Sequence, residues 1–510
     1  MFRFRRQVYC DNNATTQVSK TVRKRMREVL AHCYANPSSP YKMAHQAAGI
    51  LSDARERLAK AINAPPQTIL FTSCATESNN TLRAIAPLLS DKRRAVLYNP
   101  LEHPAMLETL FHLREQGFSM IPLTPDRLGR IRPEEVGQSW REDVGLLVCM
   151  AANNETGTLY DIKRMAGIAR AHGALFFCDM VQALGKIPVD VQDCGVDYAS
   201  FSAHKIHGPK GVGALYIREG APFAPFMLGG HQEEARRAGT EGLHNIAGFA
   251  AAADEIPHLL SMADELRLKR ERFVAAIREM FPACVINSPA ADECQPGTVS
   301  VTFPGTANAV VMGQLDYCGV SVAAGSACNT GEDAPSHVLT AMGLSREEAR
   351  ATLRISFPHA LSDKDLRYVI AVFGEVLSGK GSRVTVLQPS QLTEEVLFAP
   401  DIFIIDLRRT PKSEYLLKPL PDSKQFPFFS IGKHLHEIPK NRPILVTCET
   451  GYDAPVVAYY LKRKGYTRLT FLMWGILGWK LAQPQLYARF ARQHPGVEDD
   501  STHTQPGKLS

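Results

Sequence analysis

The sequence predicts an α/β protein with more than one domain. Its 510 residues exceed the roughly 100–200 residues that are typical of one domain. From about 67 to 217, short apolar runs alternate with stretches of helical spacing, as in a mainly parallel sheet wound with helices. At 378–382 the chain reads SGKGS, and a fresh strand–helix pattern begins after this flexible break. We therefore expect a large α/β domain, a smaller lobe, and a separate C-terminal α/β domain.

The individual elements follow from local patterns. Short apolar runs predict strands in the first part of the chain at Thr68–Thr72, Arg94–Tyr98, Val144–Met150, Ala174–Cys178 and Ala214–Ile217. Apolar residues three or four apart predict helices at Ser52–Asn63, Pro104–Gln116 and Ile162–His172. A long helical stretch at 243–280, a strand at Val299–Phe303, and helices at Pro335–Met342 and Asp363–Leu377 predict a small α+β lobe. Strands at Ile402–Leu407 and Ile444–Thr447 and a helix at Pro455–Arg463 follow the break.

These patterns define the expected domain limits. The first domain covers 1–378, with a large part at about 16–250 and a small part formed by 1–15 and 251–378. A linker at 379–385 leads to a C-terminal domain at 386–490, and the polar segment 491–510 is expected to be a disordered tail.

Composition narrows the class of protein. Hydrophobic residues at 45% and charged residues at 22% are typical of a globular protein. A net charge of +6 gives no reason to expect direct nucleic-acid binding. The chain has no apolar run long enough to span a membrane, and its first residues lack the apolar stretch of a signal peptide, so we expect a cytoplasmic protein without a membrane partner. The 11 cysteines are scattered without CxxC pairs, which argues against a disulfide framework or a structural zinc site.

A lysine and an acid each follow an apolar, strand-like run of the sequence. Lys205 follows an apolar run in YASFSAHKIHGPKGVGALYI, and Asp179 ends another, with Gln182 three residues later. Pyridoxal phosphate needs a lysine for its Schiff base and an acid against its pyridine nitrogen. The segment CATESNN places Ala75 and Thr76 at a strand-to-helix turn, where backbone amides can bind the phosphate.

Seven motifs then carry a family resemblance from Val8 to about Leu377. They are FTSCATESNN, LEHPAML, NNETGTL, CDMVQALGKIPVD, SFSAHKIHGPKGVGALY, RRAGTE and GSACNTGEDAPSHVL. In order and spacing this part of the chain resembles a cysteine desulfurase of the class V aminotransferase family. The resemblance implies fold-type I, pyridoxal 5′-phosphate as cofactor, and conversion of L-cysteine to L-alanine.

The resemblance also implies a role for each site residue. Lys205 would form the Schiff base, Asp179 would pair with the pyridine nitrogen, Gln182 would bond the ring hydroxyl and His103 would stack on the ring. The phosphate-binding residues would be Ala75, Thr76, Ser202 and His204, and Thr240 would reach the phosphate of a neighbouring subunit, which implies a homodimer.

Substrate residues follow from the same comparison. Arg354 in LRISF would bind the substrate carboxylate, because its planar fork suits a bidentate grip, with Asn154 and Asn13 assisting. Freed Lys205 would take the Cα proton. Cys328, in the small and polar segment AAGSACNTGEDAP, would attack the substrate sulfur as a thiolate and become a persulfide.

The C-terminal domain resembles a rhodanese-like domain. The segment CETGYDA places Cys448 between a strand and a helix, where a loop of amides can hold an anion such as a persulfide. DLRRT and FLMWGILGWK add to the resemblance. Asp453 stands where a rhodanese loop commonly has arginine, and a carboxylate there disfavours a thiolate.

We expect sulfur to pass from Cys328 to Cys448, and then to a protein or small-molecule acceptor that the sequence does not name. Two alternatives stay open. One is a related lyase that acts on selenocysteine. The other is a desulfurase whose C-terminal domain only docks a partner.

Overall fold

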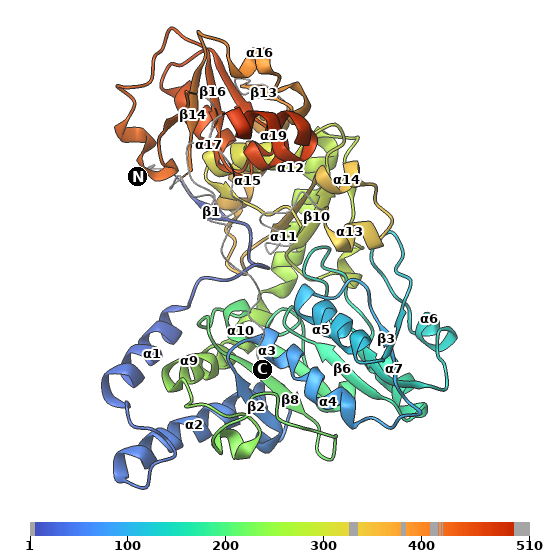
Figure 1. The fold of residues 1–510 in the computed structure, drawn as a ribbon. Coiled ribbons are helices and arrows are strands. Elements are labelled where there is room, and N and C mark those ends of the chain that lie inside the picture. The colour runs from blue at the N-terminus through green and yellow to red at the C-terminus, as the bar shows by residue number, and fades with distance from the viewer. Residues whose placement is uncertain are drawn as a thin grey trace, which may run out of the picture.

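The computed structural model describes residues 6–325, 335–378, 384–408, 417, 420 and 422–493. The large domain lies at one end of the molecule and the C-terminal domain at the other, with the small domain between them (Figure 1). The predicted fold-type I body with a C-terminal α/β domain is confirmed.

A seven-stranded sheet forms the centre of the large domain. In spatial order its strands are β2 (Ile69–Thr72), β8 (Gly213–Ile217), β7 (Tyr198–Ser202), β6 (Leu175–Asp179), β5 (Val144–Val148), β3 (Ala95–Tyr98) and β4 (Ser119–Pro122). Strand β8 runs antiparallel to both of its neighbours, whereas the other pairings are parallel. The prediction of a mainly parallel sheet is therefore confirmed, and β4 is a strand that the sequence patterns did not predict.

Both faces of this sheet are buried. In β6, Phe176 and Cys178 belong to one hydrophobic cluster, while Phe177 between them belongs to the cluster on the opposite face. Because successive side chains of a strand point to opposite faces, a sheet covered on both sides needs continuous apolar runs. The continuous apolar runs explain why the sequence pattern predicts these strands.

The predicted helices at Pro104–Gln116 and Ile162–His172 are confirmed to within one residue at each end. Helices cover the sheet, several of them at positions that the sequence patterns did not predict. They are α1 (Lys20–His32), α2 (Lys42–Ala61), α3 (Ala75–Asn80), α4 (Leu82–Ile85), α5 (Pro104–Glu115), α6 (Pro133–Gln138), α7 (Ile162–Ala171), α8 (Val191–Cys194) and α9 (Leu243–Asp254), with short 3₁₀ turns η1 (Pro66–Thr68), η2 (Ala86–Leu88), η3 (Ala203–Lys205) and η4 (Gln232–Ala235). Helix α2 starts ten residues before the predicted Ser52, because small buried residues such as Ala47 pack against α1 and α9.

The predicted long helix at 243–280 is three helices, namely α9, α10 (Ile256–Ser261) and α11 (Ala263–Met280). Pro257 lies in the first turn of α10 and has no backbone N–H to continue α9. The small domain adds β1 (Val8–Tyr9), β9 (Val285–Ile286), η5 (Ala291–Glu293), β10 (Thr298–Thr302), α12 (Asn308–Tyr317), β11 (Val320–Ser321), α13 (His337–Ala341), α14 (Arg346–Arg350), β12 (Thr352–Ser356) and α15 (Asp363–Leu377). Strands β12, β10 and β9 form an antiparallel sheet, and β1 pairs with β11.

The C-terminal domain is built on a five-stranded parallel sheet. Its spatial order is β13 (Thr385–Leu387), β17 (Leu469–Leu472), β16 (Ile444–Thr447), β14 (Phe403–Asp406) and β15 (Lys424–Gln425). The surrounding helices are η6 (Pro389–Gln391), α16 (Glu394–Leu397), η7 (Phe428–Lys433), α17 (Asp453–Arg463), α18 (Gly475–Ala482) and α19 (Pro484–Gln493). Helix α19 extends three residues into the segment expected to be a tail, and 494–510 lie outside the described residues.

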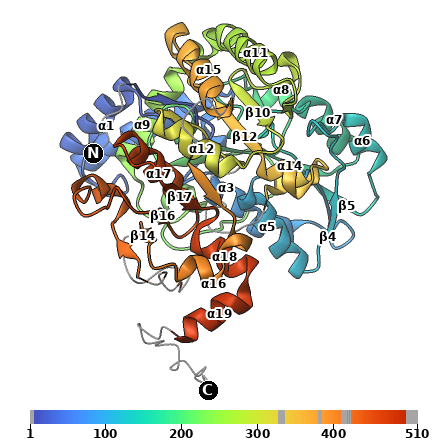
Figure 2. The ribbon, with the colours of Figure 1, turned by 90° about the horizontal axis from the view of Figure 1, so that it is seen from above.

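Helix α17 packs against α12 of the small domain, which joins the two domains (Figure 2). A Cβ atom on Gly313 would lie 2.7 Å from the Cβ of Pro455, so the helices approach closely at this glycine. Beside it, the Gln314 amide donates a hydrogen bond to the Tyr459 hydroxyl. Among the described residues, no helix is both long and apolar enough to cross a membrane.

Candidate active site and sulfur-carrier cysteines

The predicted cofactor lysine lies just beyond the carboxyl end of β7. Lys205 is the last residue of η3, and its Nζ donates to the backbone oxygens of Asn13 and Ala14 at 2.6 and 2.8 Å. Asn13 and Ala14 follow β1 in the small domain, so the N-terminal segment crosses to the large domain and meets the lysine. The carboxyl edge of parallel strands is where open α/β sheets bind ligands.

Asp179 ends the neighbouring strand β6. It is 6% exposed, its Oδ2 accepts from the Asn79 amide at 2.9 Å, and its Oδ1 accepts from the backbone N–H of Val181 at 3.0 Å. Both bonds hold the carboxylate in one orientation at the strand end. This arrangement fits an acid that pairs with a protonated pyridine nitrogen.

His103 precedes α5 and is held as a neutral ring. Its Nδ1 accepts from the backbone N–H of Ala105 at 3.1 Å. Burial lowers the pKa of His103, and the charges of Lys205 and His337 lower it further, although Asp179 opposes them. A neutral and oriented imidazole fits the stacking role that the sequence predicts for this residue.

The predicted phosphate residues gather where β7 ends and α3 begins. A Cβ atom on Gly213 would lie 2.9 Å from the backbone nitrogen of Ala75, so only glycine lets β8 pack against the start of α3. Ser202 is buried, while Thr76 is exposed at this end of α3. His204 Nδ1 lies 3.1 Å from the Thr15 hydroxyl, and burial lowers its pKa to about 4. These groups and Lys205 together fit pyridoxal phosphate.

Arg354 lies on β12 and is 2% exposed. Its Nη2 donates to Asp11 at 2.7 Å and its Nη1 to the backbone oxygen of Asn154 at 3.3 Å. Its Nε atom is buried and has no hydrogen-bond partner within the described parts of the chain. A buried guanidinium with an unused donor fits the predicted grip on a substrate carboxylate.

Asn13 links the surroundings of Arg354 to those of Lys205. Its side-chain amide donates to the Asn154 oxygen at 3.1 Å and to the Thr298 hydroxyl at 2.9 Å, while its backbone oxygen accepts from Lys205. The substrate residues and the cofactor residues therefore belong to one hydrogen-bonded region between the two domains.

Two further predicted residues are Cys328 and Thr240. Cys328 lies outside the described residues, but the ends of its segment are close together. A Cβ on Gly325 would lie 3.2 Å from both the Ser336 Cβ and a Glu155 carboxylate oxygen, and the Ser336 hydroxyl donates to Glu155 at 2.6 Å. Thr240 is exposed on the single chain.

Cys448 follows β16 at the carboxyl edge of the C-terminal sheet. It is 3% exposed, and its Sγ accepts from the backbone N–H of Gly451 at 3.1 Å. Burial, and after it the charge of Asp453, raise the pKa of the Cys448 thiol to about 12, although amides of the loop oppose this rise. The loop therefore has the predicted cradle of amides, but it holds a neutral thiol.

Replacing Asp453 by asparagine should lower the pKa of Cys448, because one of the two causes that raise it is removed. A fall of about one pKa unit increases the thiolate fraction about tenfold below the pKa. We expect faster alkylation of Cys448 by iodoacetamide at pH 8, measured by peptide mass spectrometry. Asp401→Asn, at an exposed site in the same domain, is the matched control, and equal rates in the two variants would contradict the assignment.

Two buried residues of the site were missed by the sequence patterns. Asn79 holds Asp179, and Lys186 lies with its ammonium group 2.8 Å from the Asn13 Oδ1 atom. The sequence feature that could have indicated Lys186 is that it is the single charged residue in the run MVQALGKIPV, four residues after Gln182.

Comparisons with known proteins agree with this geometry. The Aminotransferase class-V family model matches residues 8–369, and the Rhodanese-like domain model matches residues 389–482. A cysteine desulfurase of Enterobacter agglomerans is 35% identical over 405 residues, which cover 78% of this chain and 99% of that protein. The cysteine desulfurase NifS of Azotobacter vinelandii is 36% identical over 366 residues, covering 71% of this chain and 90% of that protein.

Solved structures give the same result. A NifS-like protein superimposes with a TM-score of 0.68 at 36% identity, covering 73% of this chain and all of that chain (100%). A structure described as SspA in complex with cysteine has a TM-score of 0.61 at 33% identity, covering 69% of this chain and 99% of that chain. The chain therefore belongs to the class V aminotransferase family, whose members use pyridoxal 5′-phosphate, is related to the cysteine desulfurases, and carries a rhodanese-like domain at its C-terminal side.

Proposed function

We propose that this protein is a pyridoxal-phosphate-dependent cysteine desulfurase that passes sulfur from Cys328 to Cys448. The observation that carries the proposal is the buried Arg354, whose unused donor lies in the same hydrogen-bonded region as Lys205. The related proteins named cysteine desulfurases support L-cysteine as the substrate.

The residues of this chain divide the reaction between them. Arg354 binds the substrate carboxylate, and Lys205 removes the Cα proton and can return one. The cofactor, when bound, supplies an electron sink for the charge that develops at Cα. His103, whose pKa is lowered by burial, would stack on the cofactor ring. Together these groups weaken the bond between Cβ and sulfur.

Cys328 takes the sulfur. Its thiolate forms a bond to the substrate sulfur as the Cβ–S bond breaks, and protons complete L-alanine. L-cysteine and the Cys328 thiol thus become L-alanine and the Cys328 persulfide. In the second step the Cys448 thiolate attacks the outer sulfur of that persulfide, which returns Cys328 to a thiol and leaves the persulfide on Cys448. Neither step needs an added oxidant or reductant.

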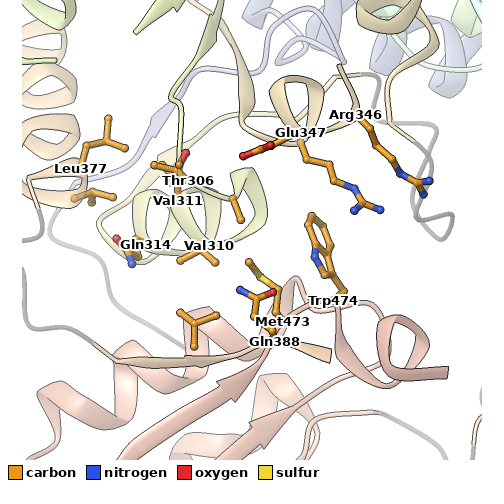
Figure 3. A pocket seen from close by; sticks show the side chains of 15 residues that line it. Thr306, Val310, Val311, Gln314, Arg346, Glu347, Leu377, Gln388, Met473 and Trp474 are labelled. Atoms are coloured by element: carbon orange, nitrogen blue, oxygen red, sulfur yellow. The ribbon is translucent and has the colours of Figure 1, made fainter. Parts of the chain in front are cut away.

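The contact between the domains supports the second step. A cavity of about 740 Å³ lies between the small domain and the C-terminal domain (Figure 3). Met473 and Trp474 line it from one side, and Arg350 of α14 stacks over the Trp474 ring at 5.5 Å from the other. Strands β16 and β17 pair in parallel, so Cys448 and Met473 lie at the same edge of the sheet and pack in one cluster. The edge that carries Cys448 therefore faces the small domain, which also carries Cys328.

The direct test is to incubate the protein with L-cysteine and map persulfides by mass spectrometry. We expect persulfide on both cysteines in the unchanged protein, and on neither in Cys328→Ser. A Cys328→Ser protein that still loads Cys448 would overturn the relay. An unchanged protein that loads only Cys328 would favour the alternative of a docking domain, which the burial and raised pKa of Cys448 support.

The domain contact gives a second prediction. Gly313→Ala adds a methyl group where only 2.7 Å separates it from Pro455, so the two helices must move apart. We expect slower loading of Cys448 by about tenfold or more, with the first turnover of alanine release unchanged. Gly167→Ala is the matched control, because Gly167 also lies in a helix and a Cβ there meets no atom within 4 Å. Equal loading rates in both variants would contradict the proposed route.

We also infer a homodimer in the cytoplasm, in which Thr240 reaches the phosphate site of the second subunit. The exposed position of Thr240 supports this arrangement. Sedimentation velocity on the protein with bound cofactor should give twice the 56.3 kDa mass of the chain. A monomer with full activity would contradict the proposed homodimer. The final acceptor is a protein or a small molecule that accepts persulfide sulfur.

A further inference from the structure

Lys186 is a buried lysine that the reaction outlined above does not use. It is 8% exposed and lies between β6 and α8. Its ammonium group donates to the Asn13 Oδ1 atom at 2.8 Å, to the Gln295 Oε1 atom at 3.2 Å and to the Gln182 Oε1 atom. All three acceptors are amide oxygens. Burying a charged lysine on neutral partners is costly, so its position needs an explanation beyond packing.

The ammonium group determines which way the Gln182 amide points. A lysine has donors and no acceptor, so it can only face the oxygen of that amide. The nitrogen of Gln182 must then face the other way, where it donates to the backbone oxygen of Asn13 at 2.9 Å. The same backbone oxygen accepts from Lys205 at 2.6 Å. Lys186 is therefore linked to the cofactor lysine through Asn13, both directly and by way of Gln182.

Asn13 is fixed in the same manner. Its side-chain oxygen is held by Lys186, so its side-chain nitrogen is left to donate to the Asn154 oxygen and the Thr298 hydroxyl. The Asn154 oxygen also accepts from Arg354. One ammonium group thus orders two amides that lie between the cofactor residues and the substrate residues.

The charges around Lys186 also indicate a role in the site. Burial lowers its pKa well below the usual value, and the charges of Lys205 and Arg354 add to this. Two cationic side chains, Lys205 and Arg354, therefore lie near the Lys186 amine, and Asp11 is the carboxylate partner of Arg354. Such a region favours bound anionic oxygens, as a ring hydroxylate and a substrate carboxylate would supply.

We propose that Lys186 is a positioning residue that orients the Gln182 and Asn13 amides, so that an N–H group of Gln182 faces the cofactor ring and the Asn13 backbone oxygen faces Lys205. This inference rests on the proposed function, because it assigns the orientation of groups around the cofactor. Lys186 acts through the Gln182 and Asn13 amides that it contacts.

The test measures cofactor affinity in a double-mutant cycle. Apo-protein of the unchanged chain, Lys186→Met, Gln182→Ala and the double variant is titrated with pyridoxal phosphate, and visible absorption reports binding. We expect Lys186→Met to weaken binding about tenfold, as loss of a hydrogen bond from a charged group does. Because Lys186 acts through Gln182 as well as Asn13, the same change in the Gln182→Ala background should cost clearly less than about tenfold. Additive losses would overturn the proposal.

Two further variants separate positioning from general damage. Lys269 is also a buried lysine, 7% exposed, and donates to Glu265 and to the Leu361 backbone oxygen in the small domain. Lys269→Met should lower the melting temperature without changing cofactor affinity. Lys186→Gln keeps a donor at the site, so we expect affinity between those of the unchanged chain and Lys186→Met. Equal affinities for the unchanged chain and both Lys186 variants would overturn the proposal, whereas failure of the unchanged chain to bind the cofactor would overturn the proposed function instead.

Discussion

Alanine formation from L-cysteine should fall about 10³-fold or more in Lys205→Ala, because general acid–base catalysis alone contributes about 10²–10⁴-fold and this variant also loses the covalent link to the cofactor. The Lys205 ammonium group contacts the backbone oxygens of Asn13 and Ala14, and the change removes these hydrogen bonds together with the reactive group. Visible absorption of the protein-bound cofactor should change at the same time.

Lys210→Ala is the control for this result. Lys210 is an exposed lysine in the same loop, five residues further along the chain. It should keep both alanine release and cofactor absorption. Alanine release above about one tenth of the unchanged rate in Lys205→Ala, beyond the range that loss of a general base allows, would show that another group removes the Cα proton.

The sequence predicted the part of the site that depends on strand ends. Asp179 and Ser202 each close a run of apolar residues, and the structure shows these runs as adjacent parallel strands, β6 and β7. Because parallel strands expose their carboxyl ends at one edge, two residues far apart in sequence could be expected at one place. Apolar strand patterns of this kind can be recognised in a sequence without knowledge of tertiary contacts.

The remaining part of the site depends on contacts between distant segments. The Asn13 oxygen meets Lys205 across 192 positions of the chain, and no local pattern encodes that distance. Lys186 was overlooked for a related reason, since its partners Asn13 and Gln295 come from the small domain. The predicted helix limits were wrong where a single residue interrupts the backbone hydrogen bonds of a helix. Pro257 does this between α9 and α10.

The environment of Cys448 shows another limit. The sequence indicated a strand, a cysteine and an amide-rich loop, and the structure has all three in that order. The loop that carries Cys448 packs closely against the backbone of Trp474 and Gly475. A Cβ on Gly475 would lie 2.4 Å from the Cys448 backbone oxygen. This close approach of two loops lies between separate segments of the chain, so the cysteine motif itself does not predict it.

Changing Arg354 to lysine should raise the KM for L-cysteine by about 10- to 100-fold, because a charge-assisted hydrogen bond contributes about 1.5–3 kcal/mol. Lysine keeps the positive charge beside Asp11, but it cannot reproduce the two parallel donors of a guanidinium. The unused Nε donor is also lost. Since the change affects binding of the carboxylate rather than the proton transfer by Lys205, kcat should fall much less than KM rises. Steady-state kinetics of alanine release measures both quantities.

The control for Arg354→Lys is Arg408→Lys in the C-terminal domain. Arg408 is 6% exposed and pairs with the buried Asp406, so both variants change a buried arginine that pairs with a carboxylate. A general loss of folding would affect the two proteins alike and would appear as a lower melting temperature. A rise in KM that is confined to Arg354→Lys therefore reports the substrate carboxylate. If both variants keep the KM of the unchanged protein, the carboxylate is bound elsewhere, and the unused donor of Arg354 serves another group.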